Sequence, residues 1–387
     1  MDKRQLKDRA IRVGFDARIF SQAMNGVARY ATALLTGLAG DGHFEIYLFS
    51  DTPLRDEYKE HTARHRLILL KNRKLKKYWK NWILPVQLLR CKIDLYHATW
   101  DKGMPVIPPV KSVMDIHDLY SISPENTVPG AGKKSARLIN YLLETSAAKK
   151  IFTTSENAKK EIVERLRVKP EKVVVTYLGC NASYVKSKVD QKRRVLDGDY
   201  FISIVGRLDD VRKNAAFLIK AFGLFLKTAG EAGGRYKLAV VGSGDEKSEP
   251  VIALKKLIAS LGLDGKVVIT GYLDDTALYS TMAGAKAMIF PSLFEGFGIP
   301  ILEAFLLEVP VITSNTSSMP EIASGRSALL IDPRSEASLA DAITALCKDE
   351  SLRGALAAAG LKRCGDFDWK LSMSKIINTY EEIYGKR

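Results

Sequence analysis

The sequence predicts an α/β protein made of two doubly wound domains that face each other across a cleft. Short apolar runs alternate with longer segments whose apolar residues recur at helical spacing, and this alternation is typical of parallel sheets with crossover helices. The alternation is interrupted once by a charged stretch and then restarts. At 387 residues, the chain is also too long for one ordinary core and suits two domains.

The first domain is predicted over residues 1–187. It begins with the apolar run IRVGFDA, and the NGVARYATALLTGLAG stretch that follows has apolar residues at the spacing of a helix. The same criteria predict strands at residues 11–17, 44–50, 93–100, 112–120, 149–155 and 171–179, and helices at residues 25–40, 135–148 and 156–167.

Residues 188–199 are charged and lack an apolar face, so they are predicted to be a linker. The tail, residues 366–387, is amphipathic and predicts a last helix, with the DFD run at its start as a cap. This helix could pack on its own domain or cross back to the first. The second domain is predicted over residues 200–365, with strands at 200–206, 236–244, 266–273, 285–292, 310–315 and 328–333, and helices at 214–229 and 250–262.

Composition excludes several classes of protein. Hydrophobic residues make up 46% of the chain, as in globular proteins. No apolar run approaches the roughly 20 residues that a membrane-spanning helix needs. The charged N-terminal residues do not resemble a signal peptide. The four cysteines lie far apart without a CxxC pair, which argues against a zinc site and a disulfide framework. Together these features predict a cytoplasmic protein.

The net charge of +15 is unevenly distributed. A basic-aromatic segment, residues 61–92, holds ten Lys and Arg residues and no acidic residue, with Tyr78, Trp79 and Trp82 interleaved. This composition favours contact with an anionic membrane surface or a lipid-linked acceptor, and hence a peripheral location on the inner face of the cell membrane. The alternative is a solvated basic face whose aromatic side chains pack into the core. Nucleic acid is not an expected partner.

In doubly wound sheets, ligands bind beyond the carboxyl ends of the strands, so the loops after strands are candidate sites. Asn25 and Gly26 open the helix after the first strand, where a glycine allows close approach to the backbone and a helix N-terminus attracts anions. A plain turn residue is the alternative. VVGSGD at 240–245 resembles a shortened phosphate loop but lacks the third glycine of the dinucleotide fingerprint, so a nicotinamide cofactor is not expected.

One loop of the second domain carries two candidate phosphate-binding cations. Arg207 directly follows a predicted strand, and Lys213 lies just before the next helix. A guanidinium fork and an ammonium placed in this way can neutralise a diphosphate. The alternative is a pair of solvated cations that form surface ion pairs with Asp209 and Asp210.

The stretch PSLFEGFGIPILEAF places two carboxylates around a tight turn. Glu295 lies in a loop with Gly296, Phe297 and Gly298 after a buried strand, and Glu303 lies near the start of the next helix. Two carboxylates beside backbone N–H groups suit pairs of sugar hydroxyls. A general acid/base pair is one alternative. A glutamate that only favours the helix dipole is another.

Taken in order, these motifs resemble the signature of the GT4 family of retaining glycosyltransferases, over nearly the whole chain. The resemblance implies the GT-B fold of two Rossmann-like domains, in which the second domain binds most of the donor and the last helix returns to the first domain. The opening stretch GFDARIF…NGVARYATALL is similar to that of bacterial mannosyltransferases of surface-polysaccharide assembly. The matching motifs are the turn at Gly26, the His117-Asp118 pair, the Arg207 and Lys213 pair, and the E-x7-E motif of Glu295 and Glu303.

The resemblance implies a role for each matching residue of the second domain. Arg207 and Lys213 would bind the donor diphosphate. Glu295 would hold hydroxyls of the transferred sugar, supported by the backbone from Gly296 to Gly298. Glu303 would bind the ribose hydroxyls of the nucleotide.

The resemblance implies two further roles in the first domain. Gly26 would let its loop meet the diphosphate and the acceptor, and His117 would lie beside the anomeric centre. His117 and Glu295 are therefore the expected catalytic residues.

The implied reaction is a transfer with retention, in which the nucleoside diphosphate leaves from the face that the acceptor attacks. No DxD motif lies in a strand-end loop, so neither a divalent metal nor a cofactor is expected. GDP-mannose is the expected donor, and the expected acceptor is a lipid-linked sugar, an oligosaccharide or a polysaccharide. The alternatives are a UDP-sugar-dependent glucosyltransferase, an epimerase or phosphorylase on the same fold, and a basic module that binds membrane or nucleic acid.

Overall fold

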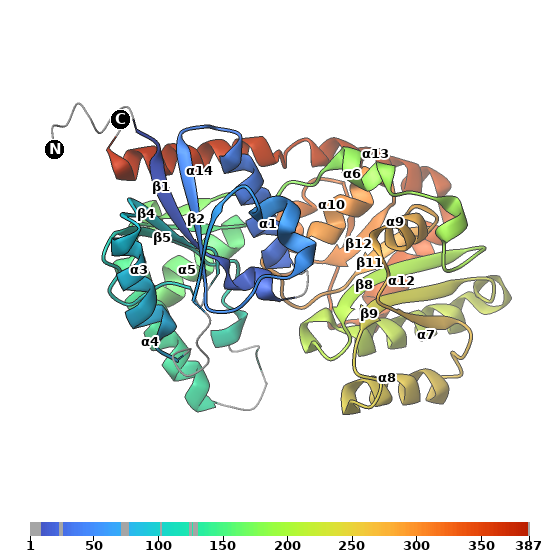
Figure 1. The fold of residues 1–387 in the computed structure, drawn as a ribbon. Coiled ribbons are helices and arrows are strands. Elements are labelled where there is room, and N and C mark those ends of the chain that lie inside the picture. Colours follow the sequence, from blue (N-terminus) through green and yellow to red (C-terminus); the bar gives the residue numbers. More distant parts are fainter. Residues whose placement is uncertain are drawn as a thin grey trace. The chain divides into compact units, whose positions relative to one another are not determined.

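The computed structural model describes residues 9–22, 26–70, 77–100, 103–123, 126 and 131–385 and divides into two compact units (Figure 1). Unit 1 contains the described residues up to Leu178 together with those from Trp369 onward, and unit 2 is Gly179–Asp368. Each unit has one parallel sheet with helices on both faces, so the predicted pair of Rossmann-like domains is confirmed. Asn25 and part of the basic-aromatic segment, residues 71–76, lie outside the described residues.

The sheet of unit 1 has seven parallel strands in the order β3-β2-β1-β4-β5-β6-β7. Six of them overlap predicted strands. The edge strand β3 was not predicted, because its half-exposed side chains lie in the basic-aromatic segment and show no strong alternation. The strands are β1 (Ile11–Asp16), β2 (Phe44–Ser50), β3 (Arg66–Leu69), β4 (Leu95–Ala98), β5 (Lys111–Asp115), β6 (Lys150–Thr153) and β7 (Val173–Val175).

Two helices cover one face of this sheet, and three cover the other. The tail forms α14, which packs beside α1 over the first face and buries Met373, Ile376 and Tyr380 (Figure 1). Helices α3, α4 and α5 form the second layer. The helices of unit 1 are α1 (Gly26–Ala39), α2 (Lys59–Thr62), α3 (Leu84–Arg90), α4 (Ala131–Ala147), α5 (Glu156–Leu166) and α14 (Trp369–Tyr384).

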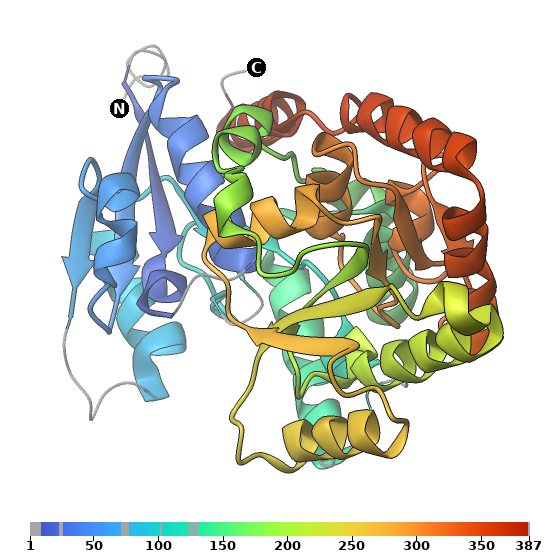
Figure 2. The ribbon, with the colours of Figure 1, turned by 90° about the vertical axis from the view of Figure 1, so that its right-hand side faces the viewer.

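The sheet of unit 2 has six parallel strands in the order β10-β9-β8-β11-β12-β13, and Figure 2 shows β8, β9 and β10 side by side. Helices α7, α8 and α12 bury their apolar side chains against one face, while α9 and α10 lie on the other. The strands are β8 (Tyr200–Arg207), β9 (Lys237–Ser243), β10 (Val267–Gly271), β11 (Ala287–Phe290), β12 (Val311–Ser314) and β13 (Leu329–Ile331). The helices are α6 (Ala182–Ser187), α7 (Ala215–Gly233), α8 (Glu249–Ser260), α9 (Asp275–Ala283), α10 (Ile299–Leu306), α11 (Met319–Ile322), α12 (Glu336–Lys348) and α13 (Glu350–Cys364).

The boundary between the units falls at Leu178, earlier than the predicted end of the first domain at residue 187. The predicted linker, 188–199, is bound to α9 of unit 2. The backbone N–H groups of Asp190 and Val195 donate to the hydroxyls of Ser280 and Thr281. The charges of this stretch suggested a solvated connection, but its backbone hydrogen bonds attach it to unit 2.

The basic-aromatic segment is partly core and partly surface. After β3, its described part forms a π-helical turn, Trp79–Ile83, and then α3. Trp79 is only 1% exposed and belongs to the core of unit 1, whereas Trp82 is 70% exposed. The segment therefore has one tryptophan in the core and one on the surface, and the sequence allowed both environments. Among the described helices, none is long and apolar enough to cross a membrane.

Candidate active site

The strand order of the second sheet reverses between β8 and β11. From β8 the chain continues outward to β9 and β10, and from β11 it continues outward to β12 and β13 on the other side. Doubly wound sheets bind ligands beyond the carboxyl ends of the strands at such a switch point. The loops after these two strands carry Lys213 and Glu295, and the structure places Lys213 Nζ 2.6 Å from Glu295 Oε1.

The Lys213–Glu295 pair is only partly exposed. Their side chains are 20% and 14% exposed, and the ammonium lies 5.4 Å from the centre of the Phe290 ring. An ammonium has three donors and a carboxylate about four acceptor positions, so neither group is saturated by this single contact. The pair can therefore offer donors to an anion and acceptors to hydroxyl groups at the same place.

Arg207 ends β8 and makes a different ion pair. Its guanidinium donates to both carboxylate oxygens of Asp209, over 3.0 and 2.6 Å, while 75% of its side chain is exposed. This hydrogen bond raises the pKa of Arg207 and lowers the pKa of Asp209. The surface pair that the sequence offered as an alternative is thus present. An exposed pair contributes little to stability, so a diphosphate can replace Asp209 as the partner of Arg207.

Asn214 connects three strand-end loops, and sequence reasoning missed it. Its backbone is left-handed, with φ of 59°, which asparagine tolerates better than most residues. Its amide Nδ2 donates to the carbonyl of Pro291, over 3.2 Å, and to that of Pro333, over 2.8 Å. These bonds hold the loops after β8, β11 and β13 together beside Lys213. An asparagine directly before a helix was the available signal.

Two serines after β12 hold the backbone of the glutamate loop. The Glu295 N–H donates to Ser317 Oγ over 3.1 Å, and that hydroxyl donates to the Glu295 carbonyl over 2.7 Å. Ser318 Oγ lies 3.0 Å from the same carbonyl and 2.5 Å from the carbonyl of Phe297. The position of Glu295 is therefore fixed from a neighbouring strand. Neither serine was predicted as part of the site.

The loop from Gly296 to Gly298 supplies backbone rather than side chains. Phe297 is 4% exposed and packs edge-on against Phe367, with 5.6 Å between ring centres. Gly298 has φ of 123°, a conformation open essentially only to glycine, and α10 begins at the next residue. The sugar-binding role expected for these residues therefore depends on their main chain.

Glu303 lies in α10 and is only 4% exposed. Its Oε1 accepts a hydrogen bond of 2.8 Å from the hydroxyl of Tyr279, which lies on α9 and is 1% exposed. A carboxylate so far inside the fold needs such a donor. Tyr279 is a further site residue that sequence reasoning missed, because nothing in its local sequence marks it.

The two candidate residues of the first unit lie after a strand of the sheet and at the start of a helix that covers it. His117 follows β5, and its ring meets the ring of Tyr30 edge-on at 4.9 Å. Gly26 begins α1 and is exposed, and a Cβ at this position would meet nothing within 4 Å among the described atoms. Packing therefore does not require glycine there, in contrast to Gly242 of the VVGSGD loop. A Cβ on Gly242 would lie 3.2 Å from the backbone of Gly206.

The first sheet has its own switch point, between β1 and β4. Sequence reasoning predicted Gly26 after β1 but missed the polar cluster at the ends of these two strands. Asp16 ends β1, and Arg18 pairs with it through two nitrogens. Trp100, just after β4, donates from Nε1 to Asp16 Oδ2 over 3.0 Å. The D-A-R triplet directly after the first strand was the signal in the sequence.

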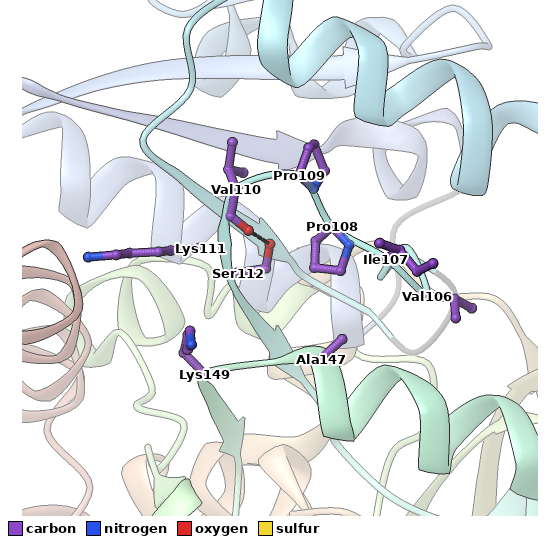
Figure 3. A pocket seen from close by; sticks show the side chains of 9 residues that line it. All are labelled: Val106, Ile107, Pro108, Pro109, Val110, Lys111, Ser112, Ala147 and Lys149. Atoms are coloured by element: carbon purple, nitrogen blue, oxygen red, sulfur yellow. Dashed lines mark hydrogen bonds between the residues drawn. The ribbon is translucent and has the colours of Figure 1, made fainter.

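A surface pocket of about 390 Å³ lies outside both switch points (Figure 3). It is formed at the amino ends of β5 and β6, whereas the candidate residues lie at the carboxyl ends of strands. In Figure 3, the hydroxyl of Ser112 donates a hydrogen bond to the carbonyl of Val110, and both residues line the pocket. The pocket therefore does not belong to the candidate site. Its lining residues are Val106, Ile107, Pro108, Pro109, Val110, Lys111, Ser112, Ala147 and Lys149.

Similar sequences identify the family of the chain. Residues 24–184 match the model of Glycosyltransferase Family 4, and residues 185–363 match that of Glycosyl transferases group 1. The O-antigen chain mannosyltransferase B of Escherichia coli is 30% identical over 279 residues, which cover 70% of each chain. The serotype-specific mannosyltransferase WbdA of the same species is 26% identical over 268 residues, which are 67% of this chain but 32% of that longer protein.

Solved structures with the same fold include sucrose-phosphate synthase from Thermosynechococcus elongatus, with a TM-score of 0.76, 18% identity and coverage of 98% and 100% of the two chains. Anabaena HepE in complex with UDP-glucose also has a TM-score of 0.76, at 18% identity, over 96% of this chain and 100% of that one. The chain therefore belongs to family 4 of the glycosyltransferases and has the GT-B fold.

Proposed function

We propose that the protein is a retaining mannosyltransferase that moves mannose from GDP-mannose to a lipid-linked sugar, an oligosaccharide or a growing polysaccharide. The observation that carries the proposal is the Lys213–Glu295 pair at the switch point of the second sheet. A nucleotide-sugar carries phosphates and sugar hydroxyls side by side, and this pair presents a cation and a carboxylate side by side.

The proposed mechanism uses these groups to position the donor and to stabilise the leaving diphosphate. Lys213 and Arg207 donate to phosphate oxygens, on which negative charge grows as the sugar leaves. Glu295 accepts hydrogen bonds from hydroxyls of the sugar, and Glu303 accepts them from the ribose. An oxygen of the leaving diphosphate takes the proton of the acceptor hydroxyl, which attacks from the same face, so the configuration at the anomeric carbon is retained. His117 would act beside that carbon, the role that the resemblance implies for it.

The choice of mannose is supported by the printed names of relatives, which include the O-antigen chain mannosyltransferase B, WbdA and a phosphatidyl-myo-inositol mannosyltransferase of Mycobacterium leprae. UDP-glucose is the competing donor, because a protein of the same fold has been solved with it. Transfer assays with both donors decide between them.

The first experiment measures sugar transfer by the full chain from GDP-mannose, UDP-glucose and other nucleotide-sugars, with and without oligosaccharide acceptors. Transfer from GDP-mannose is expected, and Lys213→Ala should lower kcat/KM by about 100-fold, as the loss of one charge-stabilising donor does elsewhere. An epimerase would convert the donor without an acceptor.

A matched control is Lys286→Ala. Lys286 pairs with Asp199 at 3.0 Å in the same unit, but it lies just before β11 and thus at the opposite edge of the sheet. This variant should keep wild-type kcat/KM. No transfer from any donor by folded protein, or equal losses in the two variants, would contradict the proposal.

We also propose that unit 1 binds an anionic membrane surface. The basic-aromatic segment packs against α4, because Lys80 pairs with Glu144 of that helix, and both elements carry exposed apolar side chains. The ammonium of Lys77 lies 4.8 Å from the ring centre of Tyr78. Cations beside exposed apolar side chains are typical of helices that lie on anionic bilayers. The exposed apolar residues are Tyr78, Trp82, Val86 and Leu89 of the segment and Ile139, Leu142 and Leu143 of α4.

Sedimentation with vesicles tests this second proposal. Binding to vesicles that contain phosphatidylglycerol is expected, with little binding to neutral phosphatidylcholine and weaker binding at high salt. Trp82→Ser should weaken it, whereas Tyr272→Ser, which removes a 79% exposed aromatic residue of unit 2, should not. Equal binding to both kinds of vesicle would refute the proposal, and salt-dependent binding of DNA without vesicle binding would favour a nucleic-acid module.

A further inference from the structure

Four buried side chains form one continuous line of polar contacts in unit 1. The hydroxyl of Tyr380 lies 2.5 Å from His97 Nδ1. His97 Nε2 lies 2.9 Å from Asp115 Oδ2, a close polar contact that does not have the geometry of a hydrogen bond. The hydroxyl of Tyr30 donates to the other oxygen of Asp115, over 2.9 Å. None of the four residues is more than 3% exposed. This buried polar chain starts on α14, crosses β4 and β5, and ends on α1.

The surroundings of the chain are apolar. The ring of His97 lies between those of Phe15 and Phe152, with 5.4 Å between centres on each side. Burial raises the pKa of the Tyr30 and Tyr380 hydroxyls well above the ordinary value, so both keep their protons. Burying a carboxylate and an imidazole in such a place costs free energy, and apolar replacements of similar volume often do as well or better for stability. A buried polar network instead specifies one arrangement of the elements that it joins.

The elements joined here carry both candidate site residues of the unit. Asp115 is the last residue of β5, and His117 lies two residues further on. Tyr30 lies four residues after Gly26, about one turn into α1. The bond between Asp115 and Tyr30 therefore fixes the start of α1 relative to the segment that carries His117.

The ring of Tyr30 also supports His117 directly. The two rings meet edge-on at 4.9 Å, and the Trp369 ring of α14 meets Tyr30 edge-on at 5.6 Å. His117 Nε2 is shielded from solvent and has no hydrogen-bond partner among the residues that the structure describes. Ring packing is therefore the main described constraint on the orientation of this imidazole.

We propose that Tyr30 and Asp115 are positioning residues for sugar transfer, and that the buried polar chain lets α14 hold His117 and the Gly26 end of α1 in register. This inference rests on the proposed function of His117. It assigns a role to α14 beyond covering the sheet, because its Tyr380 completes the chain.

The test compares two hydroxyl deletions in the full chain. Tyr30→Phe keeps the ring against His117 but removes the bond to Asp115, and it should lower kcat by about tenfold at unchanged donor KM, as small misplacements of reacting groups do. Tyr96→Phe is the matched control. Tyr96 is equally buried, lies beside His97 on β4, and donates over 2.9 Å to the Gly103 carbonyl, outside the chain. It should keep the wild-type kcat.

Further variants separate positioning from stability. Asp115→Asn keeps an acceptor for Tyr30 and should retain more activity than Asp115→Ala. Tyr380→Phe should lower kcat less than Tyr30→Phe, and the double variant should lose less than the product of the two effects. A lower melting temperature with unchanged kcat in Tyr30→Phe would mark the chain as merely structural and overturn the proposal.

A readout that needs no activity keeps the inference separate from the proposed function. The ring signal of His117 in histidine-labelled protein, assigned by its loss in His117→Gln, should shift in Tyr30→Phe and Tyr380→Phe but not in Tyr96→Phe. An unmoved signal overturns the positioning role even in an enzyme that transfers mannose. A shifted signal in protein that transfers no sugar contradicts the proposed function while supporting the link between α14 and His117.

Discussion

The loop after the first strand of each sheet contains the same turn, Asp-x-Arg. It is Asp16-Ala17-Arg18 after β1 in unit 1 and Asp210-Val211-Arg212 after β8 in unit 2. In both, the aspartate caps a 3-10 helix and accepts the arginine backbone N–H over 3.1 Å. The closest guanidinium contacts are 2.6 Å in unit 1 and 2.7 Å in unit 2. The same three-residue pattern thus gives the same local geometry in two sheets.

The surroundings of the two turns differ. In unit 1 the side chain of Asp16 is fully buried and that of Arg18 is 16% exposed, with the guanidinium 5.5 Å from the ring centre of Trp100. In unit 2 the side chains of Asp210 and Arg212 are 17% and 26% exposed, and the residue after Arg212 is Lys213. The first turn is enclosed by aromatic side chains, whereas the second presents its next residue to Glu295. One local structure therefore belongs to a core in one unit and to the loop of the candidate site in the other.

The largest expected difference between the turns is in stability. Asp16→Asn should lower the free energy of unfolding of unit 1 by about 3 kcal/mol, because it leaves the Arg18 charge buried without its carboxylate. Asp210→Asn should cost unit 2 about 1 kcal/mol, since its arginine is closer to solvent. Amide hydrogen exchange of the full chain, read on peptides from β1 and β8, measures the two units separately.

Asp209→Asn is the control for this comparison, because it removes the carboxylate of an exposed pair from the same loop of unit 2. It should leave exchange in β8 unchanged. Equal losses for Asp16→Asn and Asp210→Asn would show that the aromatic enclosure of the first turn has no energetic consequence.

A smaller effect is expected where the second turn continues into Asn214, whose left-handed backbone and two amide hydrogen bonds hold the loops beside Lys213. Asn214→Gly loses the two hydrogen bonds but adopts the left-handed backbone without strain. Asn214→Ala loses the hydrogen bonds and also strains the left-handed backbone. Asn214→Gly should lower the free energy of unfolding by about 1.5 kcal/mol. Asn214→Ala should lower it by about 1 kcal/mol more, because alanine is strained in the left-handed backbone conformation. Thermal melts of the two variants measure this order, and a more stable alanine variant would contradict it.

The sequence predicted most of this architecture because each sheet is a series of local signals. Apolar runs marked twelve of the thirteen strands in the described part of the chain. The missing one, β3, is a half-exposed edge strand that lacks that signal. The residues that complete the site are different. Tyr279 and Ser317 reach Glu303 and Glu295 from other elements, 24 and 22 residues away along the chain. Only the packing of α9 and the loop after β12 brings them there, and no local pattern encodes such a contact.

The smallest expected effect is a change of stability with pH. It tests whether the ion pair or the capping hydrogen bond of Asp210 maintains the turn in unit 2. Burial alone would raise the pKa of Asp210, but the hydrogen bond and charge of Arg212 outweigh it and lower the pKa below the ordinary value of 3.8. The folded state therefore binds fewer protons here than the unfolded state. The stabilisation from this group is fully present above the unfolded pKa and is lost as pH falls through the folded one.

Asparagine at position 210 does not titrate, so the stability difference between wild type and Asp210→Asn should shrink as pH falls from about 5 to about 3. Exchange or urea titrations of the full chain at these pH values measure the difference. Asp209→Asn serves as the comparison: the pKa of Asp209 is also lowered, but its pair is exposed to solvent, so its stability difference from wild type should change less with pH. A difference between wild type and Asp210→Asn that stays constant with pH would mean that the turn depends on the capping bond, which asparagine can also accept. The ion pair with Arg212 would then follow from the turn rather than stabilise it.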